Sequence, residues 1–493
     1  MSIRPQLLLR ETQNQGDQTL VERIVAWYSQ RIDDRLIRPG SKVSSIRQFA
    51  DEQEVSRFTV VEAYDRLIAR GYLESRRGSG FYVRERSLQA GLAVARSWAE
   101  VPQGRVDVVW LLRNMFKRLP AQDMPGGGVL PAEMLDEALV TTSLRTLSRQ
   151  SGAGLLDYGH PQGYLPLRQQ LQLKLAEVDI QASPDQIVMT NGVTQALDLI
   201  AQHFIRPGDT VLVDEPSWFL LFGRISLLGA RILGVPRLAD GPDLAALEAL
   251  AREHQPKLFF TTAILHNPTS SSMSAAKAFQ VLRLAETLNF KVVEDDIYSD
   301  LHPGASFQAC TRLAALDQLK NIIYLSGFSK TLAANLRVGY LVASPDLARE
   351  LTDLKMLVGL TSSELGERVV YRILSEGHYR RHLVRLRQQL NVARGPVLRE
   401  LEKLGLEVFA SPQVGMFLWA QSRYSTNSLA QAMLDKGFLL APGSLFMPDQ
   451  RDSQWLRFNV ATSNNSKMWA ALTQLLKTPK ATQNISRNRA LSA

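Results

Sequence analysis

Residues Tyr324–Tyr340 read YLSGFSKTLAANLRVGY, with a single lysine, Lys330, and an arginine, Arg337, seven positions later. Apolar runs on either side of this motif predict two short buried strands, Ile322–Leu325 and Val338–Ala343. Desolvation at the end of a buried strand lowers the pKa of a lysine, which suits its amine to form a Schiff base with an aldehyde. Arginine can hold a phosphate through two hydrogen bonds. An aldehyde and a phosphate together point to pyridoxal phosphate (PLP), the alternative being a solvated lysine near an unrelated arginine.

The composition restricts the class of protein. The 493 residues suffice for two or three domains, and 45% hydrophobic and 21% charged residues are typical of a globular protein. The one cysteine, Cys310, excludes an internal disulfide and a cysteine-built zinc site. We find neither an apolar leader nor an apolar run of about 18 residues, so we expect a cytoplasmic protein without a membrane span.

The net charge of +9 does not by itself locate a polyanion partner. Residues 1–86 hold 15 Lys and Arg against 12 Asp and Glu. Residues 477–493 contain four basic and no acidic side chains, and we expect them to form a disordered basic tail.

Residues 20–83 carry the pattern of three helices followed by a hairpin. Apolar residues recur every four positions from Leu20 to Leu36, Ser45 starts a short second helix, and Ser56 suits the N-cap of a third helix that runs to Arg70. Two short strands then flank a glycine-containing turn at residues 76–80. This order predicts a winged helix-turn-helix, whose recognition helix reads base edges and whose wing approaches the DNA backbone or minor groove.

Three segments, PGSKVSSIRQFA, EVSRFTVVEAYDRLIARGYLE and SRRGSGFYV, strongly resemble the DNA-binding domain of the GntR superfamily of bacterial transcription regulators. One departure is Val43-Ser44, where that family usually has Leu-Pro. The resemblance implies binding to double-stranded operator DNA; the alternative is a small helical protein-binding domain with an incidental basic hairpin. The residues expected at the DNA are Arg47, Ser56, Arg57, Thr59, Arg76, Arg77 and Gly80.

Residues 126–476 alternate buried β-branched runs with helical patterns, which predicts a mostly parallel sheet covered by helices on both faces. Polar residues follow the carboxyl ends of the expected strands, where ligands of such sheets bind. The expected strands are Ile187–Met189, Thr210–Val213, Leu258–Thr261, Lys291–Glu294 and Ile322–Leu325.

In chain order these strand ends carry a glycine turn that suits an anion, an aromatic residue, an asparagine, an Asp-x-x-Tyr motif and the lysine. This order resembles the class I and II aminotransferases, PLP enzymes of fold type I, from about Gly126 to Leu476. The resemblance implies that Lys330 forms the Schiff base (the internal aldimine) and that Asp295 pairs with the pyridine nitrogen. Tyr298 and Asn267 would hydrogen-bond the ring hydroxyl, and Trp218 would stack on the ring.

The same resemblance assigns the other contacts. Gly192, Val193 and Thr194, with Arg337, would hold the phosphate. Tyr158 would reach the phosphate of the neighbouring subunit.

Arg457 would bind the α-carboxylate of a substrate. Gly327 stands where the family commonly has a phosphate-binding Ser or Thr, a role that Ser326 or Ser329 could take over. Ser270 replaces the glycine of the family's Asn-Pro-Thr-Gly.

A GntR-type domain fused to an aminotransferase-like domain is the architecture of MocR-type regulators, which this chain resembles except in its linker and tail. We expect a winged helix-turn-helix at 10–86, a linker at 87–125, the aminotransferase-like domain at 126–476 with a small lobe from about 380, and the tail at 477–493. The resemblance implies a homodimeric, nucleoid-associated regulator in a bacterial cytoplasm, whose PLP site senses an amine or amino acid effector.

Two alternatives remain open from the sequence. One is a working aminotransferase with an appended DNA-binding domain. The other is a repressor whose aminotransferase half has lost PLP and only dimerises, for which Gly327 is the argument.

Overall fold

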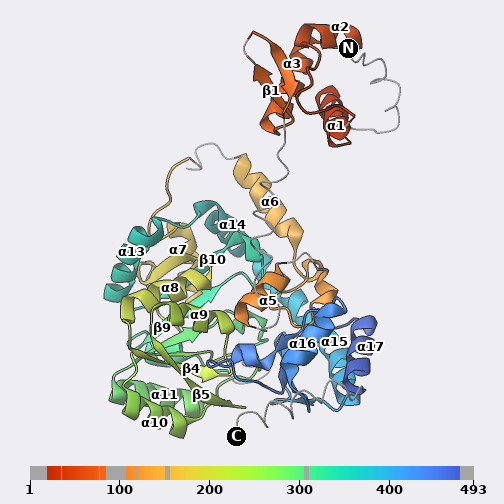
Figure 1. Cartoon of the computed structure of the whole chain (residues 1–493). Coiled ribbons are helices and arrows are strands. Elements are labelled where there is room, and N and C mark those ends of the chain that lie inside the picture. The colour runs from red at the N-terminus through yellow and green to blue at the C-terminus, as the bar shows by residue number, and fades with distance from the viewer. Residues whose placement is uncertain are drawn as a thin grey trace. The chain divides into compact units, whose positions relative to one another are not determined.

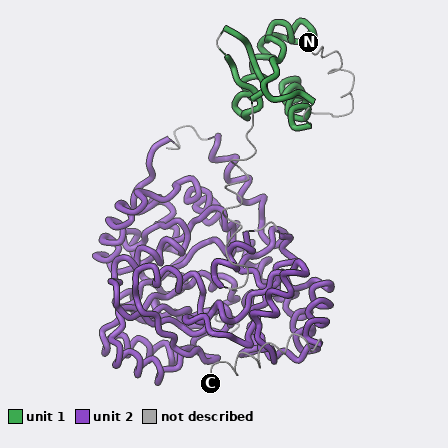
Figure 2. Tube along the Cα trace, in the orientation of Figure 1, with its two compact units in different colours: residues 1–104 green, residues 105–493 purple. Residues whose placement is uncertain are grey.

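The computed structural model describes residues 19–34, 36–76, 78–84, 107–116, 119–149, 156–304 and 310–477. The chain divides into two compact units, residues 1–104 and 105–493 (Figure 2). Residues 10–18, Arg35, Arg77 and residues 85–86 of the expected winged helix-turn-helix lie outside the described residues, as do residues 87–106 of the expected linker and the expected tail beyond Lys477.

The small unit contains three helices and a hairpin, in the order that the sequence predicts. They are α1 (Leu20–Asp33), α2 (Ile46–Gln53), α3 (Arg57–Ala69), β1 (Leu73–Arg76) and β2 (Gly80–Val83). β1 and β2 are antiparallel. The prediction of a winged helix-turn-helix fold is therefore confirmed.

Aromatic rings join the helices of the small unit. Tyr28 of α1 and Tyr64 of α3 share a hydrogen bond of 3.1 Å between their hydroxyls, and Tyr64 also donates to the Ser44 carbonyl at 2.9 Å. Val43 is buried in the same core. The departure from Leu-Pro at these positions is thus absorbed by the packing of the turn before α2.

The large unit is built on an eight-stranded sheet with helices on both faces (Figure 1). β9, β8, β7, β4 and β5 run parallel, whereas β10 is antiparallel to both of its neighbours. In spatial order the strands are β3 (Ile187–Asn191), β10 (Val338–Val342), β9 (Ile322–Gly327), β8 (Lys291–Asp295), β7 (Leu258–Thr261), β4 (Thr210–Glu215), β5 (Arg231–Leu238) and β6 (Gly241–Pro242).

Helices cover this sheet and lead from it to a second one. The α-helices are α5 (Val108–Met115), α6 (Glu137–Ser148), α7 (Leu165–Ala176), α8 (Val193–Phe204), α9 (Phe219–Leu227), α10 (Leu244–His254), α11 (Ala275–Leu288), α12 (Leu313–Asp317), α13 (Pro345–Gly359), α14 (Glu364–Ser375), α15 (His378–Lys403), α16 (Thr426–Asp435) and α17 (Ser466–Lys477). The 3-10 helices are η1 (Ala121–Asp123), η2 (Ala132–Met134), η3 (Pro184–Gln186), η4 (Ser299–Leu301), η5 (Ala334–Leu336) and η6 (Gly443–Phe446).

The long α15 leads into a smaller antiparallel sheet, as expected for the small lobe. Its strands, in spatial order, are β11 (Glu407–Val408), β12 (Phe417–Gln421), β14 (Trp455–Asn459) and β13 (Ala441–Pro442).

Part of the range that we expected to be linker packs on the large unit. Asp107 caps α5 by accepting from the Trp110 N–H at 2.8 Å, and Leu111 is completely buried in the core of this unit. The compact unit begins at residue 105. α5 is therefore an integral part of the aminotransferase-like body.

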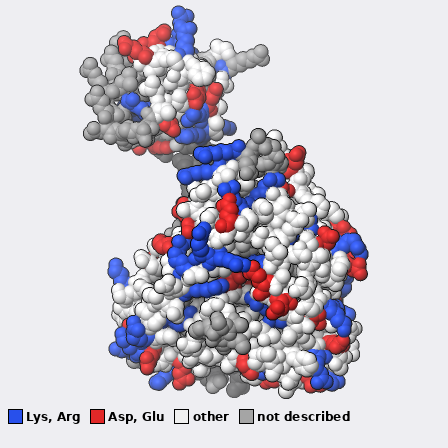
Figure 3. Space-filling view, turned by 180° about the vertical axis from the view of Figure 1, so that it is seen from behind, with Lys and Arg blue, Asp and Glu red and all other residues white. Residues whose placement is uncertain are grey.

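Charged side chains are spread over both units. The view from behind shows a group of Lys and Arg near the middle of the large unit, beside several Asp and Glu (Figure 3). The net positive charge is therefore not confined to the small unit.

Candidate functional site

A cavity of about 560 Å³ opens beyond the carboxyl ends of β4, β7 and β8. It brings together most of the side chains that the sequence assigns to one ligand. The expected residues that line it are Val193, Thr194, Trp218, Asn267, Asp295, Tyr298, Ser329, Lys330 and Arg337.

Lys330 supplies the amine. Its Nζ donates to the Gly128 carbonyl at 2.7 Å. Burial lowers the pKa of this amine to about 8, and the positive charge of Arg457 acts in the same direction. A large fraction of the amine is therefore neutral, and nucleophilic, near pH 8.

Asp295, the last residue of β8, supplies a carboxylate to the same cavity. One of its oxygens accepts from the Ile297 N–H at 3.2 Å. Burial raises the pKa of this carboxyl to about 7, and the positive charge of Lys330 opposes that shift. A further cation in the cavity, such as a protonated ring nitrogen, would favour the ionised carboxylate.

Asn267 and Tyr298 form a polar pair on the cavity wall. The Asn267 Nδ2 donates to the Tyr298 hydroxyl at 3.3 Å. The Lys330 Nζ lies 5.9 Å from the centroid of the Tyr298 ring. Burial raises the pKa of Tyr298, so the phenol stays protonated and can donate to an oxygen of a ligand.

The turn before α8 is shaped for an anion. Gly192, the N-cap, has φ 73° and provides no side-chain cap to the first-turn N–H groups. A Cβ on Gly192 would lie 2.6 Å from an Arg337 terminal nitrogen. That guanidinium donates to the Asn191 carbonyl at 3.0 Å and approaches the Thr194 hydroxyl at 3.5 Å. Backbone N–H groups and a guanidinium together suit a phosphate.

Ser326, expected as a possible phosphate contact, is not among the described residues that line this cavity. Its hydroxyl donates to the Asp296 carbonyl at 3.3 Å, because side chains along β9 alternate between the faces of the sheet. Ser329 lines the cavity and remains the candidate.

Gly327 has a steric explanation. A Cβ there would lie 3.0 Å from Gly339 Cα on the adjacent strand. The missing hydroxyl thus reflects tight strand packing, which weakens the argument that the site has lost its cofactor.

Arg457 lies on β14 next to the cavity, although it does not line it. It is buried, donates to Asn267 Oδ1 at 2.9 Å and to the Gly126 carbonyl at 2.7 Å, and stacks on the Phe417 ring at 4.5 Å. Within the described part of the chain it makes no ion pair. Burial lowers the pKa of its guanidinium to about 10. A buried cation without a counter-ion favours a carboxylate ligand.

Tyr158 lies outside the cavity and is 82% exposed. The sequence did not predict one apolar wall of the cavity. This wall is formed by Leu112 and Met115 of α5 and by Phe116, which follows the helix. In the sequence, the apolar spacing of Val106–Phe116 is consistent with an amphipathic segment that docks on the following domain, but it does not show where that segment docks.

In the small unit, the start of α3 presents the expected DNA-reading residues. Ser56 Oγ accepts from the Thr59 N–H at 3.0 Å and bonds the Thr59 hydroxyl at 2.7 Å, so these two side chains cap the helix. Arg57 is exposed and free to reach a base edge, as is Arg47 on α2 to reach a phosphate. Phe58 is 77% exposed and was missed; an aromatic ring there suits a thymine methyl group.

The wing holds one of its arginines in place. Arg76 pairs with Glu74 at 2.7 Å and stacks 4.4 Å above the Tyr82 ring. Gly80 has φ 107°, which explains a glycine at the end of the turn. Arg77 lies outside the described residues.

Comparison with known families identifies both units. The family described as aminotransferase class I and II matches residues 130–475. The chain belongs to this family. The family described as bacterial regulatory proteins, gntR family, matches residues 20–83.

Relatives of this aminotransferase-family chain include regulators and enzymes. The HTH-type transcriptional regulator YdfD of Bacillus subtilis is 28% identical over 89% of this chain and 92% of its own length. A 2-aminoadipate transaminase of Thermus thermophilus is 30% identical over 68% of this chain and 84% of its own. The structure of a Pyrococcus horikoshii kynurenine aminotransferase, solved with PMP, has a TM-score of 0.69 at 25% identity and covers 79% of this chain and 98% of its own.

The protein is accordingly a PLP-dependent, DNA-binding regulator of the MocR type. Its cavity fits PLP, with Lys330 for the aldehyde, Asp295 for the ring nitrogen and the turn at Gly192 with Arg337 for the phosphate. Bound PLP supplies an aldehyde for primary amines and an electron-withdrawing ring. Among the described residues, no helix has the length and apolar character needed to cross a membrane.

We expect Arg57→Ala to cost about 1–3 kcal/mol on the operator and to relax specificity at one base pair, because a bidentate base contact is lost. Arg47→Ala is the matched control: it should weaken binding to all sequences and lower the salt slope by about 1, as removal of a phosphate contact does. Fluorescence anisotropy on operator and random duplexes measures both. Equal losses on the two duplexes for Arg57→Ala would exclude base reading.

Proposed function

We propose that the cofactor cavity senses an amino acid, or a related amine that carries a carboxylate, and that this binding controls operator affinity. The observation that carries the proposal is Arg457, a buried guanidinium without an acid partner among the described residues, close enough to Lys330 to lower the pKa of its amine. Lys330 requires a primary amine on the ligand and Arg457 a carboxylate.

The apolar wall narrows the class of effector. Leu112 and Met115 of α5 and Leu220 and Leu221 of α9 all line the cavity. Such a wall favours an amino acid with an apolar side chain over a strongly polar one, because burying an unpaired polar group is costly.

α5 also offers a physical route from the cavity to the rest of the chain. It lines the cavity and directly follows the segment that connects the two compact units. A ligand that favours one of two positions of α5 would shift the equilibrium between them, because differential affinity for two arrangements is what shifts an equilibrium.

Screening amines and amino acids against the PLP absorption spectrum tests this proposal. An apolar amino acid should shift the visible band at lower concentration than the matching amine without a carboxylate. A series in which the decarboxylated amines act equally well would reject the carboxylate requirement.

The second candidate is a working aminotransferase. It is favoured by the presence of Lys330, Asp295, Tyr298 and Arg457 around one cavity and by the 2-aminoadipate transaminase among the relatives. Sustained turnover of an amino donor with a keto acid, at effector concentrations that leave operator affinity unchanged, would favour this alternative.

We also infer that the protein acts as a homodimer assembled through the large unit. Tyr158 and Leu156 are both highly exposed in the single chain, although large apolar and aromatic side chains of this kind are typical of interface cores. A tyrosine that does not line its own cavity can serve the cavity of a second copy.

Sedimentation velocity of the full-length PLP-loaded protein should therefore give twice the chain mass. Tyr158→Ala should lower PLP retention, whereas Phe279→Ala, which removes a partly exposed aromatic ring from α11, should not. A PLP-loaded monomer would contradict the inference.

A further inference from the structure

A second cavity, of about 710 Å³, lies in the large unit, and no described residue that lines it also lines the cofactor cavity. α7, η4 and the start of α15 form its polar wall. The charged or phenolic residues on which the argument rests are Lys174, Asp300, Arg312, Tyr379, Arg380 and Arg387.

Three of the four cations in this wall have carboxylate partners. Lys174 Nζ donates to Asp300 at 2.7 Å, and Arg312 Nε donates to Asp296 at 2.8 Å. Arg380 pairs with Glu177. Their charges are neutralised within the protein.

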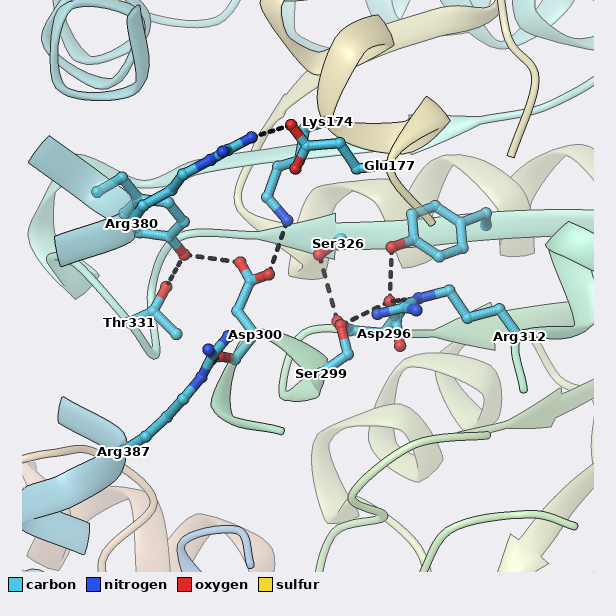
Figure 4. A network of polar contacts seen from close by, with 12 residues as sticks. Lys174, Glu177, Asp296, Ser299, Asp300, Arg312, Ser326, Thr331, Arg380 and Arg387 are labelled. Carbon is cyan, nitrogen blue, oxygen red and sulfur yellow. Dashed lines mark hydrogen bonds and ion pairs between the residues drawn. The ribbon is translucent and has the colours of Figure 1, made fainter. Parts of the chain in front are cut away.

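Arg387 differs from them. Its Nε donates to the main-chain oxygen of Asp300 at 2.9 Å, and it forms no ion pair with any residue that the structure describes. It is half-buried, and Figure 4 shows it reaching from α15 toward Asp300, whereas Arg380 extends to Glu177. A half-buried guanidinium with open terminal N–H groups, at the wall of a cavity, is a site for an oxyanion.

A short chain of hydrogen bonds links this wall to the cofactor lysine. Tyr379 donates to Asp300 at 2.7 Å and shares a 2.6 Å hydrogen bond with the hydroxyl of Thr331, which is fully buried (Figure 4). Thr331 follows Lys330 directly in the sequence. Two hydrogen bonds therefore connect Asp300 with the residue that follows the lysine.

A parallel connection runs through β8. Asp295 faces the cofactor cavity, whereas its neighbour Asp296 accepts from Arg312, from Ser299 at 2.7 Å and from Tyr324 at 2.6 Å. Asp295 lines the cofactor cavity, and the adjacent Asp296 binds Arg312, which lines the second cavity.

We propose that the 710 Å³ cavity is a second ligand site, for a small carboxylate or phosphate anion held by Arg387. Binding of this anion changes the position of Lys330 through the hydrogen bonds that link Asp300, Tyr379 and Thr331. The anion bridges α15, which leads into the small lobe, to α7 and η4 beside the large sheet. Its binding does not depend on the effector proposal for the cofactor cavity, because the two cavities share none of the described lining residues.

The binding test uses the full-length protein saturated with PLP, so that the phosphate turn at Gly192 is occupied. Inorganic phosphate and succinate are titrated separately by calorimetry, with sodium chloride at matched ionic strength as the blank; saturable binding of one of them identifies the chemistry of the anion. Arg387→Gln should weaken that binding about 10- to 100-fold, as loss of a charge-assisted hydrogen-bonding group does. Arg381→Gln, on the same helix but outside the cavity lining, is the matched control and should bind normally. Absence of saturable binding for both anions, or equal weakening by the two variants, would overturn the site.

The coupling test reads the PLP absorption band during the same titration. The band should shift as the anion saturates the wild-type protein. Tyr379→Phe should bind the anion and lose the shift, because only the hydroxyl between Asp300 and Thr331 is removed; thermal melts establish that this variant is folded. Anion binding without a spectral change in the wild type would overturn the coupling.

Discussion

Replacing Lys330 by alanine should abolish borohydride-stable attachment of PLP. The amine lines the cavity, and burial lowers its pKa to about 8, so it is the nucleophile that the site offers to an aldehyde. Peptide mapping after reduction measures the attachment. Lys320→Ala removes a lysine that is 70% exposed and serves as the control that should retain it.

A second buried lysine, Lys355, is an alternative attachment site that the same experiment can exclude. Burial also lowers the pKa of Lys355 to about 8, but its Nζ already donates to the Pro161 and Met189 carbonyls at 2.6 and 2.8 Å. It does not line the cofactor cavity. PLP found on Lys355 would show that desolvation alone selects the lysine and would refute the site.

The rate of attachment has a predictable pH dependence. Only the neutral amine reacts, and a pKa lowered to about 8 makes the neutral form predominate above that pH. The rate at which apo-protein takes up PLP should therefore rise as the pH increases through about 8. An ordinary lysine would show this rise only near pH 10.4 or so.

Arg457→Ala should remove the response of operator affinity to amino acids while PLP stays attached to Lys330. The guanidinium is the buried cation beside the cavity that the described chain leaves without a carboxylate, so its loss removes the partner of the effector. Operator titrations with and without effector measure the response.

Arg394→Ala provides the matched control for Arg457→Ala. Arg394 is also a buried arginine, with its pKa lowered by burial to about 10, but it lies on α15 and does not line the cofactor cavity. Should Arg457→Ala respond to effector as the wild type does, the effector is not held by its carboxylate, and a simple amine or free PLP becomes the better candidate.

The sequence predicted the strands of the large sheet best where they are fully buried. β7 and β9 are largely apolar and completely buried, β8 has a buried centre at Val292 and Val293, and polar residues at the ends of these strands line one cavity. β5 was missed because Arg231, Gly234 and Pro236 interrupt its apolar pattern, which a strand near the edge of the sheet tolerates.

Side-chain direction was harder to predict than side-chain position. Ser326 lies four residues before Lys330 and Ser329 directly before it. Only Ser329 lines the cavity, because Ser326 belongs to a strand whose residues alternate between faces. The wall formed by α5 could not be placed from the sequence either. The apolar face of α5 indicates that the helix packs against the rest of the protein. Only the tertiary structure shows that it packs beside the cofactor cavity.

Operator affinity measured across a titration with an apolar amino acid tests the central claim most directly. For the PLP-loaded wild type, saturation should change the affinity about 5- to 150-fold, which is a coupling of about 1–3 kcal/mol. Lys330→Ala, which has no amine to exchange with the ligand, should show no change at any concentration. An amino acid that shifts the PLP spectrum of the wild type but leaves its operator affinity unaltered would contradict control of DNA binding from this cavity.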